Sequence, residues 1–559
     1  MRDKYDAIIV GSGASGGAVA YQLCKAGYRV ALLEKGRLIR REEFSKDELA
    51  YCRRDIVTPN LFDEYHTIEE KIDGAWVETP TFESGWSFWN GNIVGGSSNL
   101  MSGMLHRMHP DDFRLKTVYG EIEGANIEDW AISYEELEPY YTLAEELVGI
   151  SGKAQPHPYK APRSTKDFPQ APTQESAITK LFDRSCKALG VTPLITPRAV
   201  LSQDRGERLA CYYSNFCGSY GCSSGAKGSS REAFIAPALA TGNLTLLTNS
   251  HVTKLHSTQK EVTEVEVVNT LTLASQKLSA KIFVLALQAH ESSRLLLNSA
   301  NTFHPQGLSN SSGEVGKNLI FSAGGAGGGT FYRKSMKAKD FEALMQRGLF
   351  VNRSLLDWYI QKNWLGDKKK GGLVEFMFEH QNNISRAIST RYSNSRLLWG
   401  KELAQAMHSS FTQSKKIRFE IFNDWLPTDD CFLSLDTKRK DKYGMSVGKL
   451  RIHGHPHDMS VAKRIAKECE KVLQEMGAED IYSSLSSTPP QNLIAGGCRF
   501  GDDPKRAVLN KNCQSFDIAN LFVADASFMP TGGSTPYTWT IYANALRIGD
   551  IIIKSKKLS

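Results

Sequence analysis

The N-terminal end of the chain carries the sequence feature that most constrains its fold. Residues 7–10 (AIIV) are an apolar run typical of a buried strand, residues 11–17 (GSGASGG) form a glycine-rich turn, and the apolar spacing of residues 18–26 is helical. A second apolar run at residues 29–33 ends at Glu34. This order of strand, glycine turn, helix and strand predicts a βαβ unit of the kind that binds dinucleotides.

Each glycine of the turn has a mechanical role in such a unit. Gly11 allows the tight turn, Gly13 lets the backbone approach a pyrophosphate, and Gly16 lets the helix pack closely on the strand. The helix begins near Ala14 and Ser15, and its N-terminus would direct free N–H groups at the phosphates. A turn of purely structural glycines is the alternative interpretation.

The acidic residue after the second strand extends the dinucleotide pattern. Glu34, followed by Lys35, stands where it can accept hydrogen bonds from the adenosine ribose. NAD and FAD share this fingerprint. Further glycine-rich segments recur at residues 91–98 and near the C-terminus, and such dispersed contacts suit a long flavin dinucleotide. The sequence therefore favours FAD.

Length and composition indicate a folded protein of more than one domain. At 559 residues the chain exceeds the roughly 250–300 residues at which one core stops growing. Its 41% hydrophobic and 23% charged residues are ordinary for globular proteins. A formal charge of +7 over so large a surface falls short of the basic stripe of a nucleic-acid binder, so no nucleic-acid partner is expected.

The sequence also bears on targeting. No stretch approaches the eighteen or so consecutive apolar residues of a membrane-spanning helix, so no transmembrane segment is expected. The charged residues 1–6 lead directly into the first strand and leave no room for a secretory signal. The expected location is the cytoplasm, or the periplasm if a partner subunit carries the export signal.

Several ordered segments beyond the first turn add to the flavoprotein interpretation. They are residues 94–99 (VGGSSN) with 109–113 (HPDDF), 130–141 (WAISYEELEPYY), 243–255 (NLTLLTNSHVTKL), 315–319 (VGKNL) and 520–550. In this order they resemble the signature segments of the glucose–methanol–choline (GMC) flavoprotein oxidoreductases. Within residues 130–141, Ser133 and Glu136 have the spacing of a capping box at a helix start.

The resemblance implies an α/β fold with two discontinuous domains. A Rossmann-like FAD-binding domain would take residues 1–115, 225–325 and 490–559. An α+β substrate-binding domain with an antiparallel sheet, as in p-hydroxybenzoate-hydroxylase-like folds, would take residues 116–224 and 326–489. The glycine run at residues 324–329 fits either a strand or a flexible loop.

The same resemblance implies further residues that contact FAD. They are Gly95, Gly96, Asn99, Leu100, Met101, Ser102, Val252, Ala286, Asp525, Ala526, Pro536 and Thr538. Val252 would meet the adenine, and Asp525 the ribityl or pyrophosphate part. Family members that tether FAD use a histidine at the position of Leu100, so FAD is expected to bind non-covalently here.

The catalytic positions of the family are altered in this chain. GMC enzymes pass a hydride from a carbinol carbon to the flavin while a base, usually histidine, takes the hydroxyl proton. The first histidine normally lies six residues before the arginine of a Gly-x-x-Arg-x-Gly segment, here Arg499, and that position is Leu493. Its neighbours Gln491 and Asn492 cannot take a proton at neutral pH.

The second catalytic partner normally precedes Pro-Thr, yet Thr535 or Pro536 stands there. The candidate catalytic residues are then Gln491, Asn492, Thr535 and His290, with His106 and the histidines of residues 453–457 as further sources of a base. For residues 451–459 the favoured interpretation is a turn into a helix that begins near Ser460. Three functions stay open: a dehydrogenase whose base lies elsewhere, an oxidase or lyase, and an FAD-binding subunit without redox activity.

Three of the ten cysteines, Cys211, Cys217 and Cys222, cluster in a glycine- and serine-rich loop. A structural zinc would lack a fourth ligand nearby, whereas three cysteines suit a [3Fe-4S] cluster. The loop resembles that of gluconate, fructose and FAD-dependent glucose or glucoside dehydrogenases, where such a cluster relays electrons to a cytochrome; one cysteine of some relatives is Ser214 here. The alternatives are unligated cysteines, or one disulfide and a free thiol.

Together these features predict an FAD-dependent dehydrogenase that oxidises a CH–OH group of a sugar, glycoside or polyol. Electrons would leave one at a time through the cluster. The resemblance implies a small exported subunit and a cytochrome c as partners.

Overall fold

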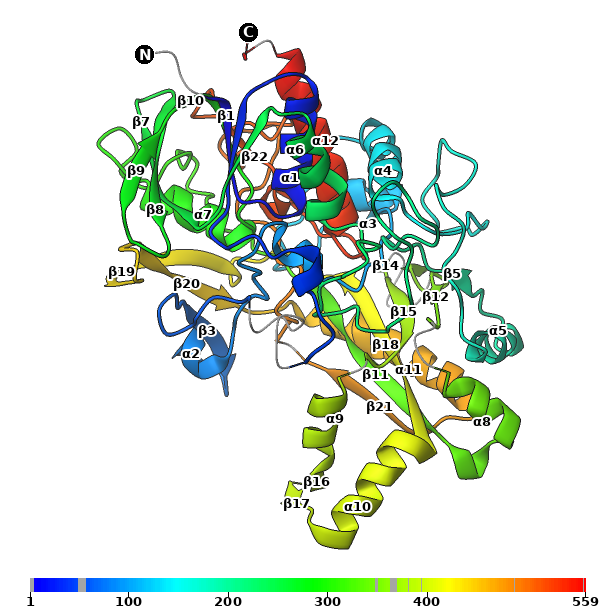
Figure 1. Ribbon diagram of the computed structural model, residues 1–559. Helices are drawn as coiled ribbons and strands as arrows, with labels where there is room; N and C mark the ends of the chain where they lie inside the picture. Colours follow the sequence, from blue (N-terminus) through cyan, green and yellow to red (C-terminus); the bar gives the residue numbers. More distant parts are fainter. Residues whose placement is uncertain are drawn as a thin grey trace.

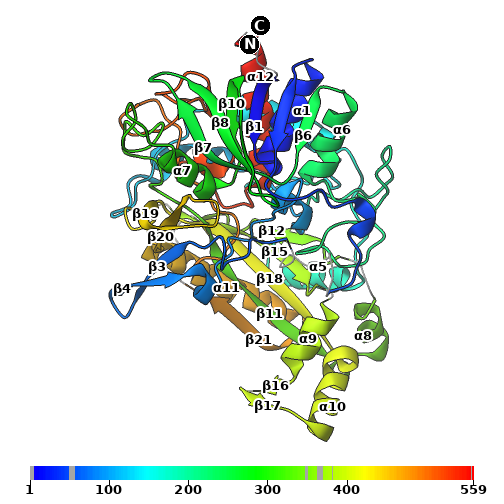
Figure 2. The ribbon, with the colours of Figure 1, turned by 60° about the vertical axis from the view of Figure 1, so that its left-hand side comes forward.

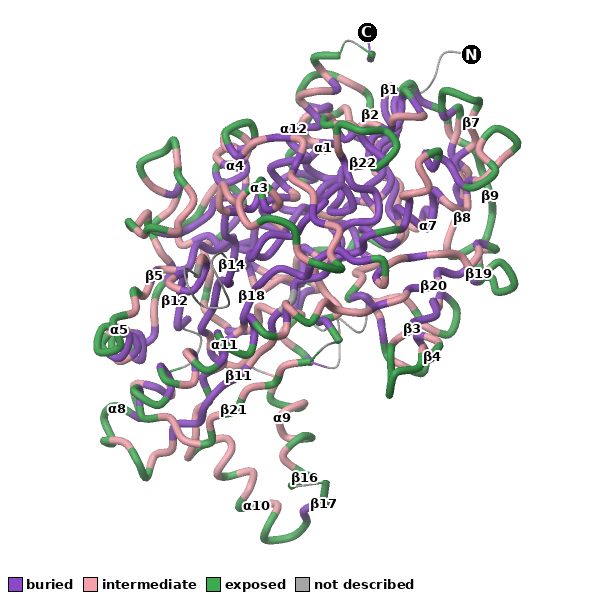
Figure 3. The backbone as a smooth tube through the Cα atoms, turned by 180° about the vertical axis from the view of Figure 1, so that it is seen from behind, coloured by how far each residue is buried: buried purple, intermediate pink, exposed green. Residues whose placement is uncertain are grey.

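The computed structural model describes residues 5–48, 57–346, 350–361, 369–380, 382–393, 395–486, 488–555 and 557–558. Two large sheets dominate it, a parallel sheet in the upper part of Figure 1 and an antiparallel sheet in the lower part. Figure 3 shows that buried residues concentrate around these two sheets. Among the described residues, no helix is both long enough and apolar enough to cross a membrane.

The parallel sheet has the strand order β22-β10-β1-β2-β6. Its strands are β1 (Tyr5–Val10), β2 (Val30–Leu33), β6 (Leu244–Leu247), β10 (Ala280–Leu285) and β22 (Leu521–Val523). β1 and β2 are buried along almost their whole length, as expected for parallel strands covered on both faces. The predicted Rossmann-like unit is confirmed, and its strands come from three distant parts of the chain.

Helices cover one face of this sheet. Helix α1 (Ala14–Lys25) packs against α12 (Thr538–Lys554), and α6 (Ala236–Ala240) lies next to them. Gly549 permits the contact, because a Cβ at this position would lie 2.7 Å from the Cβ of Gln22. On the other side of β10 lie α7 (Ala289–Asn298) and an antiparallel sheet of β7 (Ser250–Ser257), β8 (Val262–Asn269) and β9 (Ser275–Leu278).

The antiparallel sheet has the order β21-β11-β18-β15-β12-β5 and confirms the expected second kind of sheet. Its strands are β5 (Leu194–Ile195), β11 (Ser322–Tyr332), β12 (Arg353–Leu355), β15 (Gly372–Phe378), β18 (Ser414–Asp424) and β21 (Glu479–Leu485). The glycine run at residues 324–329 lies inside β11 and is therefore a strand. A Cβ at Gly328 would lie 2.6 Å from the carbonyl oxygen of Ile417, so the run lets β11 approach its neighbours closely.

One face of the antiparallel sheet packs on the long helix α11 (Pro456–Glu475). Ile417, Phe419 and Ile421 alternate along β18 and join Val461 and Ile465 of α11 in one buried cluster. Because side chains alternate along a strand, the residues between them face the opposite side. That opposite side is turned toward the parallel sheet.

Smaller elements complete the fold. A four-stranded sheet combines β3 (Thr67–Ile72), β4 (Ala75–Pro80), β19 (Phe432–Lys440) and β20 (Ser446–Ile452). Elsewhere lie α2 (Thr81–Ser84), α3 (Leu115–Tyr119), α5 (Ile178–Ala188), α8 (Ala338–Leu344), β13 (Ile360–Gln361) and β14 (Lys369–Lys370). A projecting arm contains α9 (Asn383–Thr390), β16 (Tyr392–Ser393), β17 (Arg396–Leu397) and α10 (Gly400–His408).

Helix α4 (Tyr134–Val148) begins with the predicted capping box. The amide of Glu136 donates to Ser133 Oγ at 3.3 Å, and the amide of Ser133 donates to Glu136 Oε2 at 2.9 Å. These two bonds satisfy backbone donors that the first turn of a helix leaves free. The capping box is therefore confirmed.

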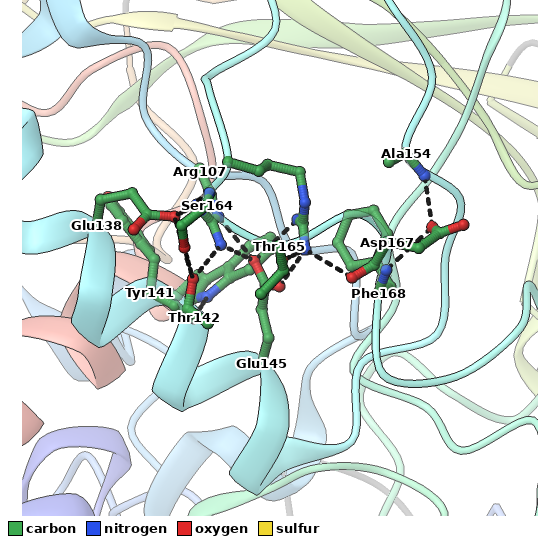
Figure 4. Close-up of polar contacts among 12 residues, drawn as sticks. Arg107, Glu138, Tyr141, Thr142, Glu145, Ala154, Ser164, Thr165, Asp167 and Phe168 are labelled. Atoms are coloured by element: carbon green, nitrogen blue, oxygen red, sulfur yellow. Dashed lines mark hydrogen bonds and ion pairs between the residues drawn. The ribbon is translucent and has the colours of Figure 1, made fainter.

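Buried charges tie α4 to the segment that follows it (Figure 4). Arg107 donates to Glu145 Oε1 and to Glu138 Oε1, each at 2.7 Å. Arg163 donates to the other oxygen of Glu145 at 2.5 Å. Each carboxylate of this network thus has a guanidinium partner, which a buried charge needs to be tolerated.

Candidate active site

A cavity of about 830 Å³ lies where the carboxyl ends of β1 and β2 face the inner side of the antiparallel sheet. Val10 and Leu33 line one part of it, and Gly324, Glu420 and Phe422 line another. Ligands of open parallel sheets characteristically bind outside the carboxyl ends of the strands. The cavity is therefore the candidate active site.

The N-terminal glycine turn forms one end of the cavity, and its three glycines differ in what a side chain would meet. Gly11 has φ +95°, and a Cβ there would overlap the carbonyl oxygen of Ala286. A Cβ at Gly16 would overlap the carbonyl oxygen of Gly11. At Gly13 a Cβ would meet no protein atom within 4 Å. Gly11 and Gly16 are thus required by the fold, whereas Gly13 leaves open space beside the cavity.

The start of α1 can receive an anion. Gly13 is its N-cap residue, and no side chain caps the first turn. The free N–H groups and the positive end of the helix dipole therefore meet the cavity. A diphosphate fits this end.

Glu34 and the second glycine segment are joined to the turn through Ser12. Its hydroxyl donates to Glu34 Oε2 at 2.5 Å and accepts from the amide of Gly95 at 2.9 Å. The amide of Gly36 donates to the other oxygen of Glu34 at 2.8 Å. Burial raises the pKa of Glu34, although these bonds act in the opposite direction. The carboxylate is held in place at the cavity wall.

Asp525 reaches the cavity from the C-terminal part of the chain. The amide of Ser527 donates to its Oδ1 at 3.0 Å, and the Ser292 hydroxyl donates to its Oδ2. Burial raises the pKa of Asp525 above its ordinary value, against the effect of these hydrogen bonds. Its position is therefore fixed by α7 and by the short turn that follows β22.

Most residues expected to contact FAD line this one cavity. They are Gly11, Gly13, Ala14, Ser15, Glu34, Lys35, Gly96, Leu100, Met101, Ser102, Val252, Ala286, Asp525, Ala526, Pro536 and Thr538. Gly16, Gly95 and Asn99 do not line it; they shape the backbone behind the wall. The assignment of these residues to FAD stays a prediction.

The first altered catalytic position lies in the cavity wall. Leu493 lines the cavity with φ +56° and packs near Phe422. Asn492 also lines it, and its Oδ1 is buried without a hydrogen-bond partner among the described residues. Gln491 does not line it: its amide oxygen accepts from the Ser87 amide at 2.8 Å.

The two candidates for the second altered position, Thr535 and Pro536, line different cavities. Thr535 borders a separate small cavity together with His106, and its buried hydroxyl has no hydrogen-bond partner among the described residues. His106 is paired with Glu375. Neither group reaches the main cavity, whereas Pro536 does.

His290 lies in a buried cluster behind the wall and does not line the cavity. Its ring stacks on Phe88 with centroids 4.3 Å apart, and burial lowers its pKa to about 3. Its ligand atoms and those of His66 and Glu291 form the one group of three or more His, Cys, Asp or Glu residues within 4.8 Å of one another in the described part of the chain.

A hydrogen-bonded network explains this cluster better than a metal ion. His66 Nδ1 accepts from the Gly448 amide at 3.3 Å, so Nε2 carries the proton and donates to Glu291 at 3.0 Å. Arg294 lies 3.3 Å from the other oxygen of Glu291. A proton and a guanidinium thus occupy the places that an ion would need.

The histidines of residues 453–457 serve the start of α11. The helix begins at Pro456, not near Ser460, and His455 is its N-cap residue. His455 Nδ1 accepts from the His457 amide at 3.2 Å, and Nε2 donates to the Glu123 carbonyl at 2.9 Å. Both ring nitrogens are therefore occupied, although His455 lines the cavity.

Two charged residues that the sequence did not single out face the cavity from β18. Arg418 and Glu420 line it, and the side chain of neither makes a hydrogen bond or ion pair to another described residue. Burial raises the pKa of Glu420; Arg418 acts to lower it and Glu375 to raise it. The alternation of apolar and polar residues along β18 can be seen in the sequence. The sequence does not indicate which face of the strand lines a cavity.

His380 lines the same end of the cavity and was also missed. Burial, with help from Arg198 and Arg418, lowers its pKa to about 4. It is therefore neutral at physiological pH and available as a hydrogen-bonding group.

The cysteine loop abuts the cofactor end of the cavity. The amide of Ser219 donates to the Leu100 carbonyl at 2.8 Å. Lys227 Nζ donates to the carbonyls of Asn99 at 3.0 Å and Cys217 at 2.8 Å. Gly218 and Ser219 themselves line the cavity.

The three thiols are half-buried and free of disulfides. Burial, followed by the charges of Cys217 and Cys222, raises the pKa of Cys211 to about 12. Burial alone would raise the pKa of Cys222, but Lys227 lowers it overall. Because the three do not form a group within 4.8 Å, they are not arranged around one ion; thiolates that bind different irons of a cluster lie farther apart.

Comparison with known proteins agrees with this architecture. 2-Methyl-1,2-propanediol dehydrogenase of Mycolicibacterium austroafricanum is 28% identical over 557 residues, covering 98% of this chain and 95% of the relative. The fructose dehydrogenase large subunit of Gluconobacter japonicus is 24% identical, covering 99% and 98%. A formate oxidase variant of Aspergillus oryzae, studied for its FAD modification, has the same fold, with a TM-score of 0.64, 15% identity and complete coverage of both chains.

The family profiles match over most of the chain. The N-terminal profile of the GMC oxidoreductases matches residues 5–322, and the C-terminal profile matches residues 427–545. The first match contains the glycine turn and the cysteine loop, and the second contains Asp525 and both altered catalytic positions. The chain therefore belongs to the GMC oxidoreductase family.

Proposed function

We propose that the protein is an FAD-dependent dehydrogenase that oxidises a CH–OH group of a sugar, glycoside or polyol. The observation that carries this proposal is one cavity with two different ends. Gly13 and the uncapped start of α1 suit a pyrophosphate at one end, and the unpartnered charges of Arg418 and Glu420 suit a hydroxylated substrate at the other. Relatives named for a diol and for fructose support the same substrate class.

The residues of the cavity wall fit FAD bound without a covalent link. The start of α1 would hold the pyrophosphate, Glu34 the ribose and Asp525 the ribityl or pyrophosphate part. Leu100 lines the cavity where a tether would begin, and an aliphatic side chain cannot form that bond. Bound FAD supplies the acceptor for the hydride; the chain must position the substrate and take its proton.

Glu420 is the group to which we assign the hydroxyl proton. Leu493 and Thr535, at the usual catalytic positions, cannot accept a proton. Glu420 faces the cavity, and burial raises its pKa toward the range in which a carboxylate is an effective general base. Arg418, two residues earlier on the same face of β18, can donate hydrogen bonds to a neighbouring hydroxyl.

We further propose that Cys211, Cys217 and Cys222 hold a [3Fe-4S] cluster that takes electrons from the flavin. Arg198 supports this assignment. It is buried, its Nε has no hydrogen-bond partner among the described residues, and it forms no ion pair with a carboxylate there. The charges of Cys217 and Cys211 act on its pKa, which burial lowers. Arg198 also donates to the Ser102 carbonyl at 2.8 Å and lies over the Phe350 ring, but it has no carboxylate bound to it in the described part of the chain. A buried cation that interacts with two of the three thiols favours an anionic group at this place.

The proposed partners follow from electron exit at the loop. A cytochrome c would receive electrons one at a time, and a small subunit would carry an export signal. The fructose dehydrogenase relative is by name a large subunit, which supports a multisubunit assembly.

The flavin and substrate assignments are tested together by anaerobic absorption spectra. Purified protein should show flavin absorption that bleaches on addition of one of 2-methyl-1,2-propanediol, D-fructose or D-gluconate. Acid precipitation should leave the flavin in solution. If no member of a broad panel of sugars and alcohols bleached the flavin, the result would favour a subunit that only binds FAD. The absence of histidine at both catalytic positions is consistent with that alternative.

Gly13→Val tests the position of the flavin. A side chain there meets no protein atom within 4 Å, so the fold should survive while the pyrophosphate is displaced. We expect loss of at least nine-tenths of the bound flavin with an unchanged thermal midpoint of the apoprotein. Ala26→Val, at the exposed end of the same helix, should retain flavin; full flavin content in Gly13→Val would refute the assignment.

Cys217→Ser tests the cluster. Wild-type protein prepared without oxygen should contain about three irons per chain and a low-temperature paramagnetic signal when oxidised. The variant should lose both, keep flavin bleaching by substrate, and reduce a one-electron dye more slowly. Ser214→Ala in the same loop is the control and should keep its iron. Iron-free wild-type protein that still reduces the dye would eliminate the relay.

A further inference from the structure

An arm extends from the lower end of the antiparallel sheet, away from the body of the molecule (Figures 1 and 2). It is formed by residues 383–413 and consists of α9, the β16–β17 hairpin, α10 and the short helical turn of residues 409–413 that leads into β18. Among its described residues, only Leu398 is buried. The arm therefore adds almost nothing to the core, and its surface needs another explanation (Figure 3).

The tip of the arm is apolar. Trp399, at the start of α10, is 77% exposed, and Tyr392 and Leu397 are each 53% exposed. Tyr392 and Leu397 lie directly opposite each other in the hairpin, so their side chains share one face. Ile384 and Ile388, one turn apart on α9 and nearer the base of the arm, are also exposed. Large apolar side chains gathered in this way mark an interaction surface.

The arm is also basic. It carries one acidic residue, Glu402, and four basic residues, Arg386, Arg391, Arg396 and Lys401, a net charge of +3 in a chain whose total is +7. Part of the net positive charge is thus concentrated on the arm. Arg391, Arg396 and Lys401 are exposed and lie next to the apolar tip in sequence.

We propose that the arm seats the protein on the surface of a bilayer that contains anionic phospholipids. Tyr392, Leu397 and Trp399 enter the headgroup region, and the basic residues contact the phosphates. Aromatic and aliphatic side chains flanked by arginine and lysine are the combination that holds a segment at such an interface.

Two other occupants fit less well. A second copy of this chain would bring two arms of the same positive charge together, which repulsion opposes. A protein partner with a stable interface needs about 800 Å² on each side, and the tip of a narrow projection offers only a few side chains. A lipid surface needs no such area, because each side chain partitions into it separately.

The base of the arm adjoins the cysteine loop. The Tyr220 hydroxyl donates to Asn382 Oδ1 at 2.5 Å, and Asn215 Nδ2 donates to the Glu379 carbonyl at 3.2 Å. A membrane seat would bring the proposed electron exit close to an acceptor in or on the bilayer. This link to electron transfer rests on the proposed function; the membrane seat itself does not.

Vesicle sedimentation with the flavin-loaded full chain tests the seat. We expect binding to vesicles of phosphatidylcholine with about one-third phosphatidylglycerol at about 0.05 M salt, and release at about 0.5 M salt. Binding to pure phosphatidylcholine should be at least tenfold weaker. The Leu397→Ser/Trp399→Ser and Arg391→Glu/Arg396→Glu variants should each lose at least tenfold in affinity for the anionic vesicles.

Matched substitutions elsewhere on the surface serve as controls. Leu271→Ser/Phe303→Ser removes two equally exposed apolar side chains, and Lys438→Glu/Lys440→Glu reverses two exposed charges. Both control proteins should bind anionic vesicles like the wild type. All variants should keep their flavin content and thermal midpoint, because the arm contributes little to the core.

Depth of insertion gives an independent measurement. Vesicles with brominated acyl chains should quench part of the tryptophan emission, and Trp399→Phe should lose that quenching while binding within about threefold of wild type. The proposal is overturned if wild-type protein does not bind anionic vesicles, or if the control variants lose binding equally. It is also overturned if Leu397→Ser/Trp399→Ser instead dissolves a dimer seen by analytical ultracentrifugation.

Discussion

Two groups of enclosed charges in this protein differ in what they are bonded to. Beside α4, Arg107 and Arg163 share Glu145 through bonds of 2.5–3.0 Å (Figure 4). On β18, the side chains of Arg418 and Glu420 make no hydrogen bond or ion pair to another described residue. The first group joins two segments of the chain, whereas the second faces a cavity.

The difference separates structural from functional charge. A buried charge without a partner is costly, so a fold keeps one only where something outside the chain completes it. A charge removed from the α4 network should therefore lower stability and leave the chemistry intact. Removal of a charge from the cavity wall should impair the chemistry and should not lower stability.

Arg107→Met should give the largest effect on stability. It leaves Glu138 without a guanidinium partner and the buried Glu145 with Arg163 alone, which should cost about 3–5 kcal/mol of unfolding free energy. Urea unfolding followed by fluorescence measures this change. The rate of flavin bleaching by substrate, in the fraction that stays folded at low temperature, should change less than about threefold.

An exposed ion pair between Glu146 of α4 and Arg205 of a distant loop provides the control. Arg205 donates to Glu146 at 2.9 Å, with its side chain 36% exposed. Arg205→Met should cost no more than about 1 kcal/mol. Equal losses in the two variants would mean that the α4 network is not a special structural element.

Glu420→Gln should give the next largest effect, which is a slower reduction of the flavin by substrate. Loss of a general base slows proton transfer by about 100-fold or more, and anaerobic stopped-flow bleaching of the flavin measures it. The free energy of unfolding should stay equal or rise, because burial raises the pKa of Glu420 and its ionised form is costly in the folded state. Glu475→Gln on the exposed end of α11 should change neither quantity.

The pH dependence sharpens this assignment. Because the folded-state pKa of Glu420 is raised, the ionised base forms only as pH rises through that raised value. The bleaching rate of the wild type should rise with pH and then level off, while Glu420→Gln should lose this rise. Besides burial, Arg418 acts to lower this midpoint and Glu375 acts to raise it. A Glu420→Gln protein with the wild-type rate and profile would contradict the assignment.

Local sequence signals predicted the elements that carry the cofactor end. Three motifs indicate local backbone conformations that depend only on residues close in the sequence: the glycine turn, the capping box at Ser133 and the second glycine segment. Gly11 and Gly16 show why: a Cβ at either position would overlap backbone oxygen. Such steric demands leave a mark in the sequence without any knowledge of the tertiary structure.

The substrate end left no comparable mark. The alternation of β18 indicated two faces, but only the packing of Phe419 on α11 decides that Arg418 and Glu420 face the cavity. His290 shows the same limit, since it stands next to a predicted cofactor segment in the sequence but lies behind the cavity wall. The domain boundaries and the role of each site residue stay predictions.

Asp167→Asn should give the smallest effect and tests the exposed edge of the α4 network (Figure 4). Partial burial would raise the pKa of Asp167, but the Lys153 ammonium and the amides of Ala154 and Phe168 lower it to about 2. A lowered pKa adds stability above the ordinary value of an aspartate, and this contribution is lost as pH falls through about 2. Since the Asp167 side chain is 33% exposed, the variant should lose at most about 1 kcal/mol at pH 7. Urea midpoints measured from pH 7 down to about pH 3 should show the two proteins converging, with Asp503→Asn in an exposed turn as the control. If Asp167→Asn lost as much stability as Arg107→Met, or if its loss did not depend on pH, the exposed charges of this network would contribute as much stability as the buried ones, contrary to our expectation.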